Sequence, residues 1–161
     1  MIASSLTPLR WVLAVCLLSL FVASAAAARS PIAAVNTENG LGIKGYDPVS
    51  YFDTGDPMRG SAQFSTTYKG VVYRFVSADH RNRFMAEPEK FVPQYGGYCA
   101  FAIAQNWIAD IDPDEWAIVG GKLYLNNGFF AQSLWSLDKS GNIAAGDRNW
   151  PLVPKLPEPS N

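Results

Sequence analysis

Two short turn signals place the strongest constraint on the fold of this chain. Lys69-Gly70 separates the run FSTTY from VVYRFV, and Gly120-Gly121 separates WAIV from KLYL. In each case β-branched and aromatic residues lie on both sides of a two-residue turn, which is typical of an antiparallel β-hairpin. The sequence therefore predicts two hairpins, one in each half of the chain.

The residues around the first hairpin predict an extended segment and two short helices. Asp47-Pro48 indicates a turn, and the β-branched and aromatic character of 49–52 favours an extended conformation. Ser77 is suited to cap a helix over 78–87, because its hydroxyl can accept a free backbone N–H. Pro88 is suited to begin a second short helix.

The residues after the second hairpin predict two more helices. The run GFFAQSLWSL has helical periodicity, and we expect Phe130, Leu134 and Leu137 to form its buried side. Asn142 is expected to cap the last helix. Strand pairs that alternate with short helices indicate an α+β fold, in which antiparallel hairpins pack against the helices of one small domain.

Differences in composition along the sequence divide the chain into four segments. With 48% hydrophobic and 17% charged residues, the chain is typical of a compact globular protein. No low-complexity stretch interrupts 42–150, which we predict to be the domain. We predict a signal peptide over 1–28, an N-terminal arm over 29–41 and a proline-rich tail over 151–161.

The first segment has the three parts of a secretory signal. Arg10 precedes the apolar run WVLAVCLLSLFVA, and the small residues SAAAARS follow it. The apolar run is shorter than the roughly 20 residues that a membrane-spanning helix needs. We therefore expect cleavage near Ala27 or Ala28, a periplasmic or secreted protein, and no membrane span in the mature chain. The net charge of −1 argues against a nucleic-acid partner.

Cleavage of this signal would leave one cysteine, Cys99, and one histidine, His80. A single thiol cannot form an internal disulfide, so Cys99 is either a small packed residue, a metal ligand or a redox centre. It follows a glycine pair in the stretch PQYGGYCAFAIAQN, which predicts a tight turn that leads into a short apolar element. His80 falls in the first turn of the predicted helix.

Four stretches, in order, resemble the YHS-domain family, in its exported bacterial stand-alone branch, which includes selenoproteins. They are KGYDPVSYF, YKGVVYRFVSADHRNRF, EPEKFVPQYGGYCAFA and KLYLN. The likeness covers about 42–150, most of the predicted mature chain. The resemblance implies a small α+β fold with a hairpin packed on short helices. It implies no settled activity, since members stand alone or are attached to metal-handling proteins.

The resemblance also implies a position for a metal site. Metal-binding relatives carry cysteines in a DPVC start and in a Cys-Ser-x-x-Cys pair, and this chain has Ser50, Val76 and His80 there. Val76 has no lone pair to offer a metal. A copper- or zinc-type site in this chain would therefore depend on His80 together with Cys99.

We therefore predict a protein that binds a metal ion or another small ligand, rather than an enzyme. The predicted site centres on Cys99 and His80, with Tyr46, Asp47 and Tyr98 as pocket neighbours. A helix N-terminus and His80 would both favour a thiolate, so Cys99 is expected to alkylate faster than a model thiol. The alternatives are a thiol redox protein that uses Cys99 and a structural or interaction domain without chemistry.

Overall fold

The computed structural model describes residues 32–155, and the predicted signal peptide and the end of the tail lie outside the described residues. The strands are β1 (Thr37–Glu38), β2 (Leu41–Gly42), β3 (Ser61–Tyr68), β4 (Val71–Phe75), β5 (Asp112–Val119) and β6 (Lys122–Asn126). The α-helices are α1 (Ser50–Asp53), α2 (Ala78–Ala86), α3 (Pro88–Phe91), α4 (Ala100–Ala104), α5 (Gly128–Leu137) and α6 (Lys139–Asn149). The 3-10 helices are η1 (Ile43–Gly45), η2 (Gln94–Gly97) and η3 (Trp150–Leu152).

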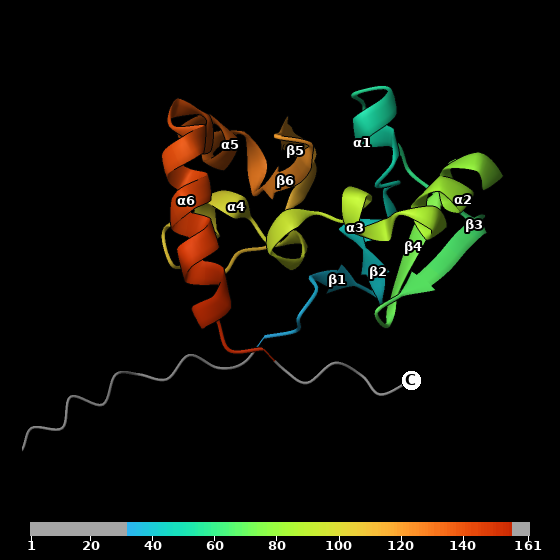
Figure 1. Cartoon of the computed structure of the whole chain (residues 1–161), viewed down its shortest axis with the longest axis horizontal. Helices are drawn as coiled ribbons and strands as arrows, with labels where there is room; N and C mark the ends of the chain where they lie inside the picture. Colours follow the sequence, from blue (N-terminus) through green and yellow to red (C-terminus); the bar gives the residue numbers. More distant parts are fainter. Residues whose placement is uncertain (1–31, 156–161) are drawn as a thin grey trace, which may run out of the picture.

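The fold is α+β, as predicted, and has two sides (Figure 1). On one side a sheet with the strand order β1-β2-β4-β3 lies with α1, α2 and α3. On the other side α4, α5 and α6 gather around the two-stranded sheet of β5 and β6. Between residues 32 and 155, no helix has the length and apolar character that crossing a bilayer requires.

Both predicted hairpins are present. β3 pairs with β4 and β5 pairs with β6, each antiparallel. Both turn residues have positive φ, 48° and 73° at Lys69-Gly70 and 59° and 74° at Gly120-Gly121. Two positive φ angles favour glycine and match the right-handed twist of the strands, so the turn residues explain the hairpins locally.

The helix starts after the first hairpin are confirmed. Ser77 precedes α2, and its hydroxyl accepts a hydrogen bond from the backbone N–H of His80 at 3.1 Å. Pro88 is the first residue of α3, where its missing N–H costs no helical hydrogen bond. Local chemistry therefore determines where these two helices begin.

The prediction of an extended segment at 49–52 is wrong, because most of it forms the helix α1. The Asp47 carboxylate accepts a hydrogen bond from the backbone N–H of Val49 at 2.8 Å. Its backbone carbonyl accepts the hydroxyl of Ser50, also at 2.8 Å. These bonds bend the chain into a helical turn, and they outweigh the weak β propensity of the residues that follow.

The predicted buried side of α5 is also wrong. Trp135 is completely buried, whereas Phe130 and Leu137 are 75% and 83% exposed. Asp138, and not Asn142, caps α6 by accepting a backbone N–H at 2.8 Å. An apolar helix offers more than one hydrophobic side, and here the side that carries the large indole is the buried one.

Aromatic side chains form much of the core on both sides. Phe84 of α2 packs against Tyr73 and Phe75 of β4, with ring centroids 5.0 and 5.1 Å apart. On the other side, Tyr124 of β6 packs against Trp135 of α5 at 5.4 Å. Such pairs stabilise a fold beyond the area that they bury. On each side, one helix, α2 or α5, is therefore attached to its sheet by contacts between aromatic rings.

The described ends of the chain lie together. The backbone N–H of Ile32 donates to the carbonyl of Pro154 at 2.9 Å, and Val153 is only 4% exposed. β1, which falls in the predicted arm, pairs with β2. Folded structure therefore extends beyond both ends of 42–150.

Two glycines with nearly the same φ test how closely the segment before β1 packs against η2. A Cβ at Gly96 (φ +60°) would lie 2.2 Å from the carbonyl oxygen of Ala34, whereas one at Gly120 (φ +59°) would meet nothing within 4 Å. We expect Gly120→Ala to lower the free energy of unfolding by about 1 kcal/mol through backbone strain alone. Gly96→Ala should cost clearly more in urea unfolding. Equal losses would contradict this close contact.

Candidate functional site

The carboxylate of Asp47 is fully buried and has partners on both oxygens. One oxygen accepts the N–H of Val49, and the other accepts the N–H of Val76 at 2.9 Å. The second oxygen also lies 2.7 Å from Nδ1 of His80, which donates to it when Nδ1 carries the hydrogen. A buried carboxylate needs hydrogen-bond partners to be stable, and both oxygens of this one have them.

The outer nitrogen of His80 faces a second carboxylate. Nε2 lies 3.5 Å from an oxygen of Asp53. The guanidinium of Arg83 donates to both oxygens of Asp53, and this contact lowers the pKa of that carboxyl below its usual value. Both ring nitrogens of His80 therefore already have acidic neighbours. The side chain is mostly buried, with an exposed fraction of 14%.

The three positions that the resemblance aligns with metal-ligating cysteines meet at Asp47. Ser50 donates its hydroxyl to the Asp47 carbonyl, Val76 donates its N–H to the carboxylate, and His80 contacts the same carboxylate. The sequence placed Asp47 beside the predicted site, and the structure makes it the centre of this cluster. The arrangement is that of a hydrogen-bonded polar cluster that joins three segments.

Cys99 lies in a different environment. It is 1% exposed and caps α4, where its sulfur accepts the backbone N–H of Ala102 at 3.4 Å. The sulfur also accepts the backbone N–H of Asn127 at 3.3 Å, and the thiol donates to Oδ1 of Asn126 at 3.7 Å. Burial raises the pKa of the Cys99 thiol, although these N–H groups oppose the shift. The expectation of an activated thiolate is therefore not supported by this environment.

The predicted site residues do not share one set of contacts. Among residues 32–155, no hydrogen bond or ion pair joins His80 to Cys99, and no group of three or more acidic, histidine or cysteine side chains could hold a metal ion. The ring of Tyr46 lies under the guanidinium of Arg59, and the hydroxyl of Tyr98 donates to a backbone carbonyl. The paired Cys99–His80 metal site stays a prediction.

Cys99 also lines a hollow of about 620 Å³. The other lining residues are small, aromatic or amide-bearing: Phe101, Ala102, Gln105, Trp107, Ala109, Asn127, Phe130 and Ala131. Two of them, Trp107 and Phe130, are 73% and 75% exposed. Sequence reasoning missed both aromatics, because Phe130 was assigned to the core and Trp107 lies in an irregular segment.

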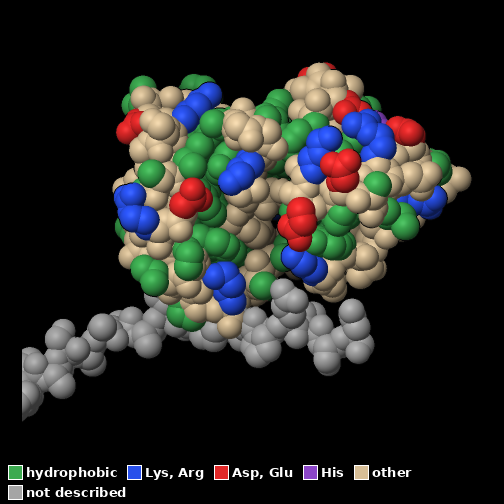
Figure 2. Space-filling model, viewed as in Figure 1, with side chains coloured by type: hydrophobic (Ala, Val, Ile, Leu, Met, Phe, Trp, Pro, Cys, Tyr) green, Lys and Arg blue, Asp and Glu red, His purple; other side chains and the backbone are tan. Residues whose placement is uncertain are grey.

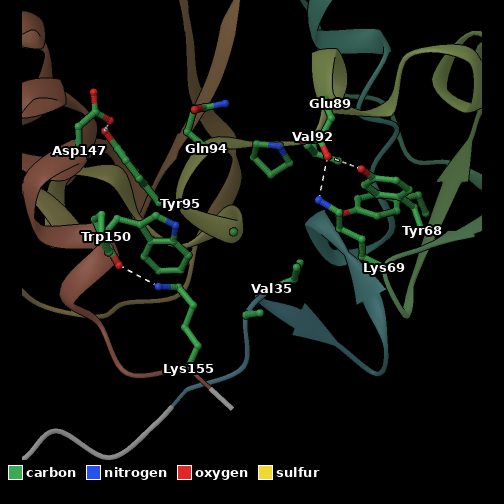
Figure 3. A pocket seen from close by; sticks show the side chains of 15 residues that line it. Val35, Tyr68, Lys69, Glu89, Val92, Gln94, Tyr95, Asp147, Trp150 and Lys155 are labelled. Carbon is green, nitrogen blue, oxygen red and sulfur yellow. Dashed lines mark hydrogen bonds and ion pairs between the residues drawn. The ribbon is translucent and has the colours of Figure 1, made fainter. Parts of the chain in front are cut away.

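A second cavity, of about 410 Å³, is shown in Figure 3. On one wall Lys69 pairs with Glu89 at 2.8 Å. On the other, Tyr95 donates to Asp147 at 3.0 Å and Lys155 donates to two backbone carbonyls. Charged groups of both signs are also interspersed over the face in Figure 2. The charged groups of this cavity already have partners within their own walls. A ligand would therefore find fewer groups free to bind it in this cavity than in the hollow beside Cys99.

Comparison with known proteins found no match: no family model, no curated protein and no solved structure matches this chain. The resemblance to YHS domains therefore depends on the sequence motifs alone. A functional interpretation has to follow from the geometry of the Asp47 cluster, the hollow and the cavity in Figure 3.

The Asp47–His80 pair leads to a stability prediction. His80→Ala would leave the buried Asp47 carboxylate without its imidazole, so we expect the free energy of unfolding to fall by about 3 kcal/mol at neutral pH. Asp47→Asn in the His80→Ala background removes the buried charge, and unfolding in urea should show that the second change costs less than it does in the wild-type chain. Additive losses would mean that the two side chains do not interact.

The buried thiol leads to a reactivity prediction. Because burial raises the pKa of Cys99, its thiolate fraction at neutral pH lies below that of a free thiol, whose pKa is about 8.5. Iodoacetamide should modify folded Cys99 more slowly than a model thiol, with a rate that rises as alkaline pH ionises the thiol. Mass analysis of the Cys99 peptide measures this, with urea-unfolded protein as the control. Fast alkylation that His80→Ala slows would instead support the predicted Cys99–His80 pair.

Proposed function

We propose that this chain is an exported YHS-like binding domain, rather than an enzyme, and that it holds a small ligand in the hollow beside Cys99. The observation that carries the proposal is the hollow itself. Its volume of about 620 Å³ lies in the range of roughly 300–1,000 Å³ that small-molecule sites occupy. Its lining is mainly apolar with a few polar groups, which is the usual composition of such sites.

The exposed aromatics beside the hollow support a binding role. Trp107 and Phe130 leave most of their apolar surface in water. Covering a large apolar side chain stabilises a complex by about 1.5–3 kcal/mol, so a ligand that contacts both residues gains substantially. Clustered exposed apolar groups on a folded domain are characteristic of interaction sites.

The copper- or zinc-type site at Cys99 and His80 has weaker support. The sulfur of Cys99 has three hydrogen-bonding neighbours, and both nitrogens of His80 face carboxylates. A shared metal ion would require both side chains to give up these contacts. A thiol redox role is disfavoured for another reason: burial raises the pKa of the Cys99 thiol and so lowers the fraction of the reactive thiolate.

Native mass spectrometry tests the proposed function. The exported protein is incubated with the low-molecular-mass fraction of a bacterial extract, and we expect it to retain a small molecule. Phe130→Asp, which places a charge at the hollow, should abolish retention. Phe129→Asp is the matched control, because Phe129 is 77% exposed and does not line the hollow.

Two results would contradict the proposal. Retention that is equal in the two aspartate variants would place the ligand elsewhere. One bound copper or zinc ion that is lost in both Cys99→Ala and His80→Ala would support the predicted metal site instead. Far-UV circular dichroism shows whether each variant remains folded.

A further inference from the structure

We infer that the hollow beside Cys99 takes an uncharged aromatic molecule. This inference rests on the proposed function and names the chemical class of its ligand. Three features of the lining carry it: the combination of aromatic rings with very small side chains, the absence of charged residues, and the kind of polar group present.

The shape of the lining suits a flat ligand. Phe101, Trp107 and Phe130 contribute rings, and the other apolar lining residues are Cys99 and three alanines. Alanine fills little space beyond the backbone, so these residues leave room in the hollow for a ligand that contacts the rings. A flat aromatic ligand can make edge-to-face or offset contacts with such rings, which add about 0.5–1.5 kcal/mol per ring pair beyond the area that they bury.

The charge of the lining selects a neutral ligand. None of the lining residues is Lys, Arg, His, Asp or Glu. A charged group in the hollow would lose part of its hydration and gain no opposite charge, which is a net cost. Gln105 and Asn127 carry amides. Asn127 already donates one amide hydrogen to the carbonyl of Asp110 at 2.8 Å, and the remaining donors and acceptors of the two amides can meet a neutral hydroxyl or carbonyl at the edge of a ligand.

Three naphthalenes that differ only in charge test the inference. They are 2-naphthalenemethanol, which is neutral, 2-naphthoate, which is anionic, and 2-naphthylmethylammonium, which is cationic. Isothermal titration calorimetry on the exported protein should show that the neutral probe binds and that each charged probe binds at least tenfold more weakly. Phe130→Ala should weaken binding of the neutral probe at least fivefold, and Phe129→Ala should leave it unchanged.

The possible failures are distinguishable. If a charged probe binds as tightly as the neutral one and still depends on Phe130, the ligand class is wrong and the proposed function stands. The same holds if no probe binds but the extract supplies a ligand that Phe130→Asp removes. If neither the probes nor the extract yields a ligand dependent on Phe130, both are wrong. Sedimentation velocity that shows dimers lost in Phe130→Ala would make the hollow an interface between two copies and would overturn both.

Discussion

The packing of one side of the molecule depends on the hydrogen bonds of the buried Asp47 carboxylate. The carboxylate holds the start of α1 through Val49, the end of β4 through Val76 and the first turn of α2 through His80. Because the carboxylate has no access to water, losing one partner would leave a charge unsatisfied in the core. Ser77 supports the arrangement, since its cap determines where α2 begins and so brings His80 to the carboxylate.

On the other side, Asn126 at the end of β6 likewise joins separate elements through hydrogen bonds of its buried side chain. Its side chain is fully buried, and its oxygen accepts the N–H of Phe101 at 2.9 Å and the Cys99 thiol. Its amide nitrogen donates to Gln132 of α5 at 2.6 Å. Asn126 thus connects β6, α4 and α5, and Cys99 is part of that connection. This accounts for the burial of the cysteine next to the hollow.

The contrast between these clusters and the hollow explains where a ligand gains most. The polar groups around Asp47 and Asn126 already have partners inside the protein, so a ligand would have to break existing bonds before it made new ones. The rings of Trp107 and Phe130 have water in place of partners over most of their surface. Binding there removes apolar surface from water without breaking an internal hydrogen bond.

The sequence by itself determined the features that neighbouring residues specify: both hairpins, the cap at Ser77 and the helix start at Pro88. Turns and caps are made by residues only a few positions apart, so their chemistry is readable along the chain. The helical turn at 50–53 is also local, because it follows from the bonds of Asp47 to Val49 and Ser50, although the β propensity of these residues concealed it. Tertiary structure decided that Trp135 is the buried residue of α5, and that His80 and Cys99 have separate partners. These outcomes depend on contacts between distant segments, such as Asp47 with Val76 and Cys99 with Asn126, and local pattern carries no information about which distant groups will meet.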